Sequence, residues 1–87
     1  MEKYYLYILH SKSLDRYYIG ISHDPEMRLR YHNIAEKGWT QRSRPWKLVF
    51  IKEFKNKVDA LKWERKLKRI KRRSIIESII KDKFEWT

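Results

Sequence analysis

Two runs of strand-forming residues lie close together at the start of the sequence. Residues 3–10 are mostly tyrosine, leucine and isoleucine, with large side chains on both alternating faces. Residues 16–22 place Tyr17 and Ile19 on one face and Tyr18 and Gly20 on the other. Because the residues between the two runs are polar turn formers, the chain is predicted to begin with a β-hairpin. The face that carries Gly20 is poor in bulk, which is typical of close approach by a ligand or another backbone.

The rest of the sequence predicts one more strand and three helices. Residues 24–26, Asp-Pro-Glu, have the features of a helix start, and Gly38 those of a helix end. Residues 47–52 form a short apolar run, typical of a strand that is buried on both faces. A helix is expected from about 57 to 71, and the capping box at 74–77 predicts the start of a last helix.

The predicted element order is strand, strand, helix, strand, helix, helix. A helical crossover between the second and third strands returns the chain in the same direction, so the first strand fits between them. We therefore expect an α+β fold, with a three-stranded antiparallel sheet flanked by helices. A chain of 87 residues has room for one hydrophobic core, so residues 1–87 are predicted to form a single domain.

Charge and composition limit the classes of function. The chain has 22 Lys and Arg against 11 Asp and Glu, a net charge of +11, which attracts polyanions and makes nucleic acid the leading partner. The absence of cysteine excludes disulfides, a thiol nucleophile and a zinc–thiolate cluster. No apolar run approaches the roughly 20 residues that span a bilayer, and no signal peptide is recognisable, so we expect a cytoplasmic protein that is not bound to a membrane.

Two groups of candidate functional residues stand out in the helices. In the first helix Arg28 and His32 lie four residues apart, at the edge of an apolar face that is predicted to contain Met27, Tyr31, Ile34 and Ala35. In the later helix the only acid between residues 62 and 73 is Glu64, which falls inside the apolar arc. An unpaired buried carboxylate would cost several kcal/mol, so Glu64 requires a cation. Either an ion pair, with Lys71 as one candidate, or a divalent metal ion satisfies that requirement.

Taken together, these residues resemble the GIY-YIG nuclease domain. Tyr5-Leu6-Tyr7 stands where that family has its GIY tripeptide, and Tyr18-Ile19-Gly20 matches YIG in the adjacent strand. Arg28 matches the arginine of the family's helix, and Glu64 matches its later metal-binding glutamate. The similarity runs from Tyr4 to about Ile70 and is greatest to small stand-alone members related to the N-terminal nuclease region of an excinuclease.

The resemblance implies a metal-dependent endonuclease that hydrolyses DNA phosphodiester bonds. Glu64 would hold one Mg²⁺ or Mn²⁺ ion, and Arg28 would neutralise charge in the transition state. Tyr7 would orient or deprotonate the attacking water. Deprotonation requires nearby cations that lower the pKa of the Tyr7 phenol. Tyr18 would form hydrogen bonds in the same pocket. His32 would share in proton transfer. Gly20 belongs to the motif itself, and the basic residues expected to contact DNA are Arg42, Arg44 and Lys68.

The sequence leaves other functions open. The first tripeptide lacks Gly and Ile, and no asparagine follows Asn56, whereas many family members have one after the glutamate. A non-catalytic nucleic-acid-binding module on the same scaffold is therefore the alternative. A basic protein on anionic membranes is a third reading, which the use of the apolar helix face in the core disfavours. Within the enzyme hypothesis we expect structure-guided or partner-directed cleavage, with a protein partner or a homodimer, because no second domain for target selection is recognisable.

Overall fold

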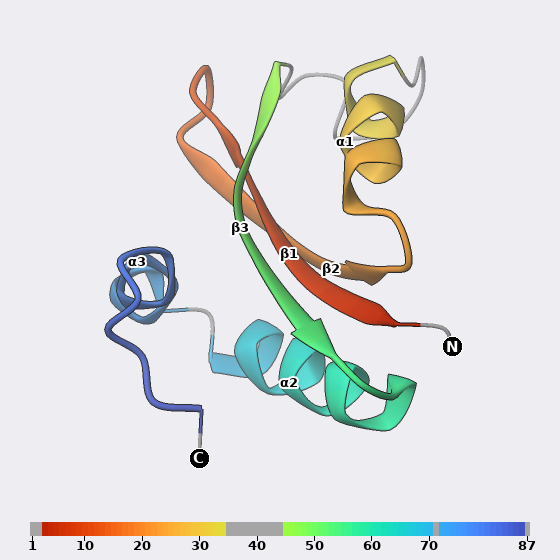
Figure 1. The fold of residues 1–87 in the computed structure, drawn as a ribbon. Coiled ribbons are helices and arrows are strands. Elements are labelled where there is room, and N and C mark those ends of the chain that lie inside the picture. Colours follow the sequence, from red (N-terminus) through yellow and green to blue (C-terminus); the bar gives the residue numbers. More distant parts are fainter. Residues whose placement is uncertain (1–2, 35–44, 71, 87) are drawn as a thin grey trace.

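The computed structural model describes residues 3–34, 45–70 and 72–86, and it contains the six predicted elements in the predicted order (Figure 1). They are β1 (Tyr4–Ser11), β2 (Arg16–Ser22), α1 (Pro25–Ile34), β3 (Trp46–Phe54), α2 (Lys57–Ile70) and α3 (Arg73–Ile80). The predicted end of the first helix at Gly38 lies outside the described residues. Within the described ranges, no helix is both long and apolar enough to cross a membrane.

The strands form one antiparallel sheet in the order β2-β1-β3, so β1 is central as predicted. In the register of the hairpin Tyr7 pairs with Gly20, and on its other side it pairs with Ile51. A break in the register between Ile8 and Leu9 lets β3 follow the twist of the sheet. The prediction of an α+β fold with a three-stranded antiparallel sheet is confirmed.

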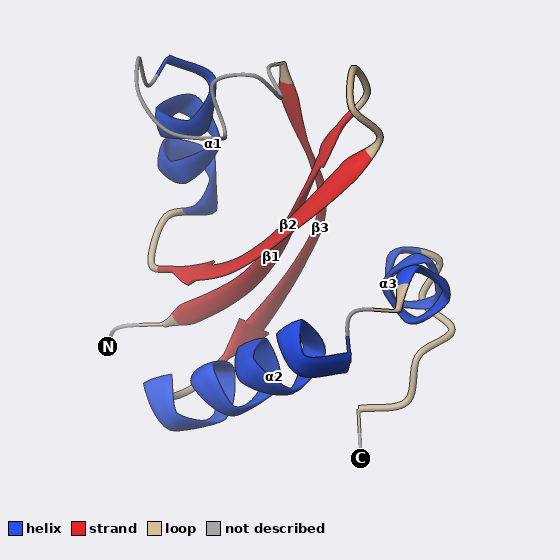
Figure 2. Cartoon of the chain, turned by 180° about the vertical axis from the view of Figure 1, so that it is seen from behind, coloured by secondary structure: helices blue, strands red, loops and turns tan. Residues whose placement is uncertain are grey.

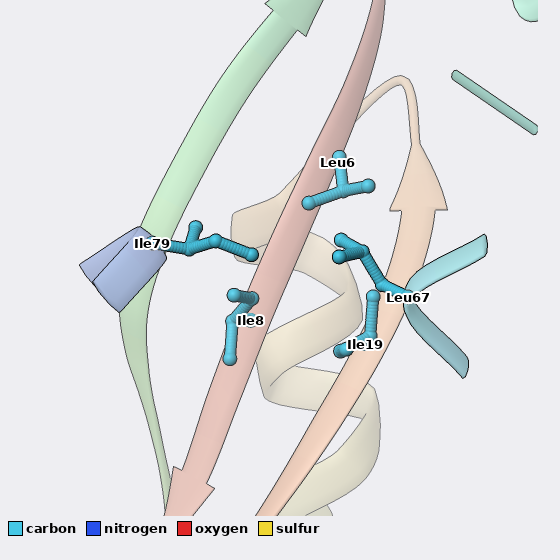
Figure 3. Packing of buried hydrophobic residues seen from close by; sticks show 5 residues of the cluster. All are labelled: Leu6, Ile8, Ile19, Leu67 and Ile79. Carbon is cyan, nitrogen blue, oxygen red and sulfur yellow. The ribbon is translucent and has the colours of Figure 1, made fainter. Parts of the chain in front are cut away.

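Helices cover both faces of this sheet, α1 on one and α2 with α3 on the other (Figure 2). The main core lies under α2 and α3, where the buried side chains converge from four elements (Figure 3): Leu6, Ile8, Ile19, Leu67 and Ile79. A smaller core under α1 contains Tyr7, Leu9 and Trp46. As the alternation of the second strand predicted, Tyr17 and Ile19 face the main core while Tyr18 faces the smaller one.

Two local predictions are wrong. The third strand is not buried on both faces, because it forms an edge of the sheet and Ile51 is 45% exposed. The last helix does not begin at the capping box either. It starts at Arg73, after the extended residue Arg72, and no side-chain hydrogen bond from Arg72 caps it. Glu77 instead accepts a hydrogen bond from Arg73 one turn earlier, at 3.4 Å.

The face on which α1 packs also differs from the prediction. Met27, Tyr31 and Ile34 are exposed, whereas His32 is buried and Leu29 packs against the smaller core. The reason lies in the partner surface, which consists of aromatic rings on β2 and β3 that accommodate an imidazole. Ala35, the fourth residue of the predicted face, lies outside the described residues.

The tip of the hairpin is anchored to α3 through Asp15. This residue adopts a left-handed conformation, with φ of 51°, and its carboxylate accepts hydrogen bonds from Arg73 at 2.7 Å and from His10 at 3.0 Å. Arg73 also donates to the backbone carbonyl of Asp15 at 3.2 Å. These contacts lower the pKa of Asp15 to about 2, and the hydrogen bond from Arg73 has the largest effect. The tip of the hairpin and the start of α3, 58 positions apart in the sequence, are thereby joined.

We expect this anchor to weaken in acid. Because the folded-state pKa of Asp15 lies below its usual value, its contribution to stability is complete above about pH 4 and disappears as the pH falls towards 2. Thermal melting of the wild type and Asp15→Asn between pH 5 and pH 2 should show a difference in Tm that shrinks as the pH falls. Asp82→Asn is a matched control, because Asp82 is also exposed and left-handed but makes no such contacts with the described residues. A pH-independent difference for Asp15→Asn would contradict the prediction.

Candidate active site

Two tyrosines on adjacent strands form the base of the candidate site. Tyr7 of β1 and Tyr18 of β2 lie on the same face of the sheet, with their ring centroids 6.3 Å apart. Gly20 is the cross-strand neighbour of Tyr7, and a β-carbon there would lie only 2.6 Å from the Tyr7 hydroxyl oxygen. The Tyr7 ring therefore crosses the space that a side chain at position 20 would fill, which gives a steric reason for glycine in the second tripeptide.

The start of α1 places Arg28 over these phenols. Asp24 caps the helix, because its carboxylate accepts a hydrogen bond from the Met27 backbone N–H at 3.1 Å. One residue further on, the Arg28 guanidinium lies within hydrogen-bonding reach of Tyr7 and Tyr18, and the bond to Tyr7 is the main reason that the pKa of Arg28 is raised. A cation fixed by two phenols is well oriented for an anion such as phosphate.

The protonation state of Tyr7 follows from its burial. The ring is 1% exposed, and desolvation raises the pKa of the phenol although the hydrogen bond from Arg28 lowers it. To act as a base, Tyr7 would need neighbouring cations to lower its pKa. The side chains of the protein do not lower it, because the effect of burial is larger. Tyr7 is a neutral phenol at pH 7 and can donate a hydrogen bond.

His32 is buried behind Tyr18. Its ring centroid lies 4.4 Å from that of Tyr18 and 6.0 Å from that of Trp46. Burial, and then the charge of Arg28, lower the pKa of His32, so the imidazole is neutral at pH 7. Neither ring nitrogen has a hydrogen-bond partner within the described residues. The imidazole thus supports the Tyr18 ring and keeps an unused acceptor nitrogen.

Glu64 joins this group from α2, the helix on the other side of the sheet. Its charge acts on Tyr7, and its side chain is mostly buried but still 17% exposed, so the carboxylate keeps partial access to solvent. The nearest cation is Lys68 one turn later, with 3.6 Å between Nζ and Oε2, while the Lys68 ammonium also lies 5.6 Å from the centre of the Tyr18 ring. The predicted need for a cation is met by Lys68. The other candidate, Lys71, lies outside the described residues.

We call Tyr7, Tyr18, Arg28 and Glu64 the candidate cluster. The four side chains come from β1, β2, α1 and α2, and they interact within one region. An ion pair does not close the carboxylate off, because the distance to Lys68 exceeds that of a hydrogen bond and the Lys68 side chain is 50% exposed. A ligand can therefore take the place of the ammonium.

The donor set of the candidate cluster fits some metal ions and not others. In the described part of the chain, no group of three or more His, Cys, Asp or Glu side chains is arranged to hold a metal ion. Zinc takes three or four protein ligands, and the described residues do not assemble such a set. Mg²⁺ and Mn²⁺ fit better, because Mg²⁺ commonly uses one or two carboxylates together with water and substrate phosphate. The partly exposed carboxylate of Glu64 provides such a ligand.

Two features of the site were not foreseen. The side-chain amide of Asn33 clamps the backbone of Trp46, accepting from its N–H at 2.6 Å and donating to its carbonyl at 3.1 Å, which fixes α1 against β3. A hydrogen-bonded contact of this kind between a helix side chain and a distant strand cannot be predicted from a pattern in a single sequence. The second is the position of Lys68, which lies beside Glu64 and Tyr18; its expected contact with DNA stays a prediction. The predicted DNA contacts Arg42 and Arg44 lie outside the described residues and stay predictions.

Known proteins are similar to this chain in sequence and in fold. The chain is 42% identical over 64 residues to the structure-specific endonuclease subunit slx1 of Schizosaccharomyces japonicus, an alignment that covers 69% of the chain and 23% of that protein. The chain thus spans less than a quarter of the length of this relative. It is 38% identical over 71 residues to a UPF0213 protein of Streptococcus pneumoniae, covering 80% of the chain and 71% of that protein.

A solved structure agrees with these matches. The solution NMR structure of a UPF0213 protein from Bacillus halodurans superimposes with a TM-score of 0.56 at 28% identity, covering 88% of the chain and 82% of that structure. The family model described as the GIY-YIG catalytic domain matches residues 3–78, a range that includes all four residues of the candidate cluster. Since this match spans most of the sequence, the chain belongs to the GIY-YIG catalytic domain family.

Proposed function

We propose that this protein is a metal-dependent endonuclease that hydrolyses phosphodiester bonds in DNA. The observation that carries the proposal is the candidate cluster, in which one partly exposed carboxylate, one guanidinium and two phenols from four elements interact. Membership of a family of catalytic domains and similarity to a protein named as a structure-specific endonuclease subunit support it. The net charge of +11 supports a polyanionic substrate.

In this proposal each residue of the candidate cluster has a separate task. Glu64 holds one Mg²⁺ or Mn²⁺ ion, which when bound supplies Lewis-acid stabilisation of the phosphate charge. The Arg28 guanidinium neutralises the additional negative charge that develops as water attacks phosphorus and the bond to the 3′ oxygen breaks. The neutral Tyr7 phenol donates a hydrogen bond that orients the reacting groups, with Tyr18 beside it.

Lys68 and His32 assist without direct chemistry at the phosphate. Lys68 neutralises Glu64 in the free protein, which lowers the energetic cost of holding a carboxylate beside the buried Tyr7. His32 holds the Tyr18 ring in place, and its neutral imidazole is able to accept a proton. We propose further that cleavage is guided by DNA structure or by a protein partner or a second copy of the chain, since the four residues of the candidate cluster address a phosphate and not a base edge.

The test is incubation of the purified chain with supercoiled plasmid and with a branched oligonucleotide, in millimolar Mg²⁺ or Mn²⁺ and in EDTA. We expect nicked and linear products that require the metal, with 3′-hydroxyl ends that a polymerase extends. The competing function is a non-catalytic nucleic-acid-binding module, which the pairing of Glu64 with Lys68 favours. That function predicts salt-dependent binding without products, and such a result with both metals and both substrates would overturn the endonuclease proposal.

A further inference from the structure

The outward face of α2 carries an open groove of about 660 Å³. The groove lies opposite the buried side of the helix, which is marked by Ala60 and Leu67. Two apolar and four basic residues line it: Val58, Leu61, Lys62, Arg65, Lys66 and Arg69. We call the four basic residues the α2 track.

The positive charge of the α2 track is not neutralised by the described part of the protein. Among those residues, no carboxylate lies within 4.0 Å of any of its four cationic groups. Among the Lys and Arg side chains of the described ranges, those that pair with a carboxylate are Lys3, Lys68 and Arg73, so the α2 track is distinguished by the gathering of four unpaired cations on one helix face. A row of unpaired cations raises the local positive potential above that of the surrounding surface, and a polyanion relieves it.

The spacing of the α2 track suits the phosphates of a nucleic-acid strand. Lys62 and Arg69 are seven residues apart, about 10 Å along the helix axis at 1.5 Å per residue. Successive phosphates of one strand of B-form DNA advance by about 3.4 Å along the duplex axis, so the track matches about three of them. A membrane surface is a poor alternative, since the groove offers only Val58 and Leu61 as apolar contacts.

The α2 track also lies next to the candidate cluster. Arg65 follows Glu64 and Arg69 follows Lys68, so each is turned about 100° around the helix from a residue at the site. We infer that the α2 track binds the phosphate backbone of duplex DNA flanking the cut, an inference that rests on the proposed endonuclease function. The duplex lies against the outer face of α2, and the strand to be cut continues past Lys68 to the candidate cluster.

The experiment removes three charges from the track and measures binding without metal, so that no cleavage occurs. The variant is Lys62→Gln/Arg65→Gln/Arg69→Gln, and Lys66 is kept because its ammonium packs 4.9 Å from the centre of the Trp63 ring. The matched control is Lys12→Gln/Lys81→Gln/Lys83→Gln, which removes the same charge from other exposed positions. The probe is a short DNA duplex titrated at several salt concentrations, and melting curves verify that both variants fold.

The expected result is a weaker complex whose plot of log K against log salt is shallower by about 2.7, or 0.9 for each lost phosphate contact. The control triple should change the slope by less than about one. Equal changes in the two triples would show that net charge acts diffusely and would overturn the inference. A loss of affinity for an RNA duplex but not for the DNA duplex would overturn it as well. Failure of the endonuclease proposal is scored separately, as absence of metal-dependent cleavage by the wild type.

Discussion

Replacement of Glu64 by glutamine is expected to lower the rate of DNA cleavage roughly 10³-fold or more, because a neutral amide is a poor ligand for a divalent cation. Of the four residues of the candidate cluster, Glu64 alone carries a carboxylate. The substitution keeps the shape of the side chain, and the lost pair with Lys68 is a partly exposed pair within one helix, worth only about a few tenths of a kcal/mol. Single-turnover rates in Mg²⁺ measure the loss.

The control for this variant is Glu53→Gln. Glu53 also pairs with a lysine, Lys3, at 3.4 Å, but it lies on β3 and belongs to neither the candidate cluster nor the α2 track. We expect wild-type rates for Glu53→Gln, and for Glu64→Gln an unchanged Tm and undiminished binding of DNA in EDTA. A cleavage rate of Glu64→Gln within about tenfold of the wild type would remove Glu64 from the mechanism.

The second large effect is expected for Arg28→Lys, with a loss of roughly 10² to 10³-fold in cleavage rate. Lysine retains the positive charge but replaces a planar group of five N–H donors by a point charge. In the protein the guanidinium is oriented by Tyr7 and Tyr18 together, and an ammonium cannot reproduce that geometry while reaching the phosphate. Since the net charge is unchanged, binding of DNA should be nearly unaffected, so the loss falls on the chemical step.

The matched control is Arg30→Lys, two residues further along α1. Arg30 is exposed, so its replacement changes the same chemical group without touching the tyrosines. Comparison of single-turnover rates and affinities for the two variants isolates the effect of geometry from that of charge. If Arg28→Lys cleaves as fast as Arg30→Lys, a positive charge at position 28 is sufficient and the oriented guanidinium is not required.

Much of the fold could be predicted because periodicity reports which face of a strand is covered. The alternation around Ile19 placed Tyr18 and Gly20 on the same face of β2, and the register of the hairpin then brings Tyr7 opposite Gly20. The position of Glu64 was informative for a similar reason, since an acid on the apolar arc of α2 requires a partner. In the structure its partner is Lys68, which also reaches Tyr18.

The remaining details depend on tertiary contacts that a helical wheel does not contain. On α1 the wheel selects the face of Met27 and Ile34, yet the surface that α1 meets is the pair of rings Tyr18 and Trp46, which favours His32. Likewise the protonation of Tyr7 depends on how completely the ring is buried, and burial outweighs the opposing effect of Arg28. Neither balance is encoded in local sequence.

The sheet has helices from two separate layers, and the candidate cluster draws Arg28 from one layer and Glu64 from the other. Glu64 and Lys68 lie on a helix that packs on the main core, yet the charge of Glu64 acts on Tyr7 of the central strand β1 and Lys68 contacts the ring of Tyr18 on the edge strand β2. An intermediate with only one helix docked would hold either the guanidinium or the carboxylate, never both in place. The candidate cluster is therefore complete only when both helix layers are docked on the sheet, so its integrity reports the packing of the whole domain.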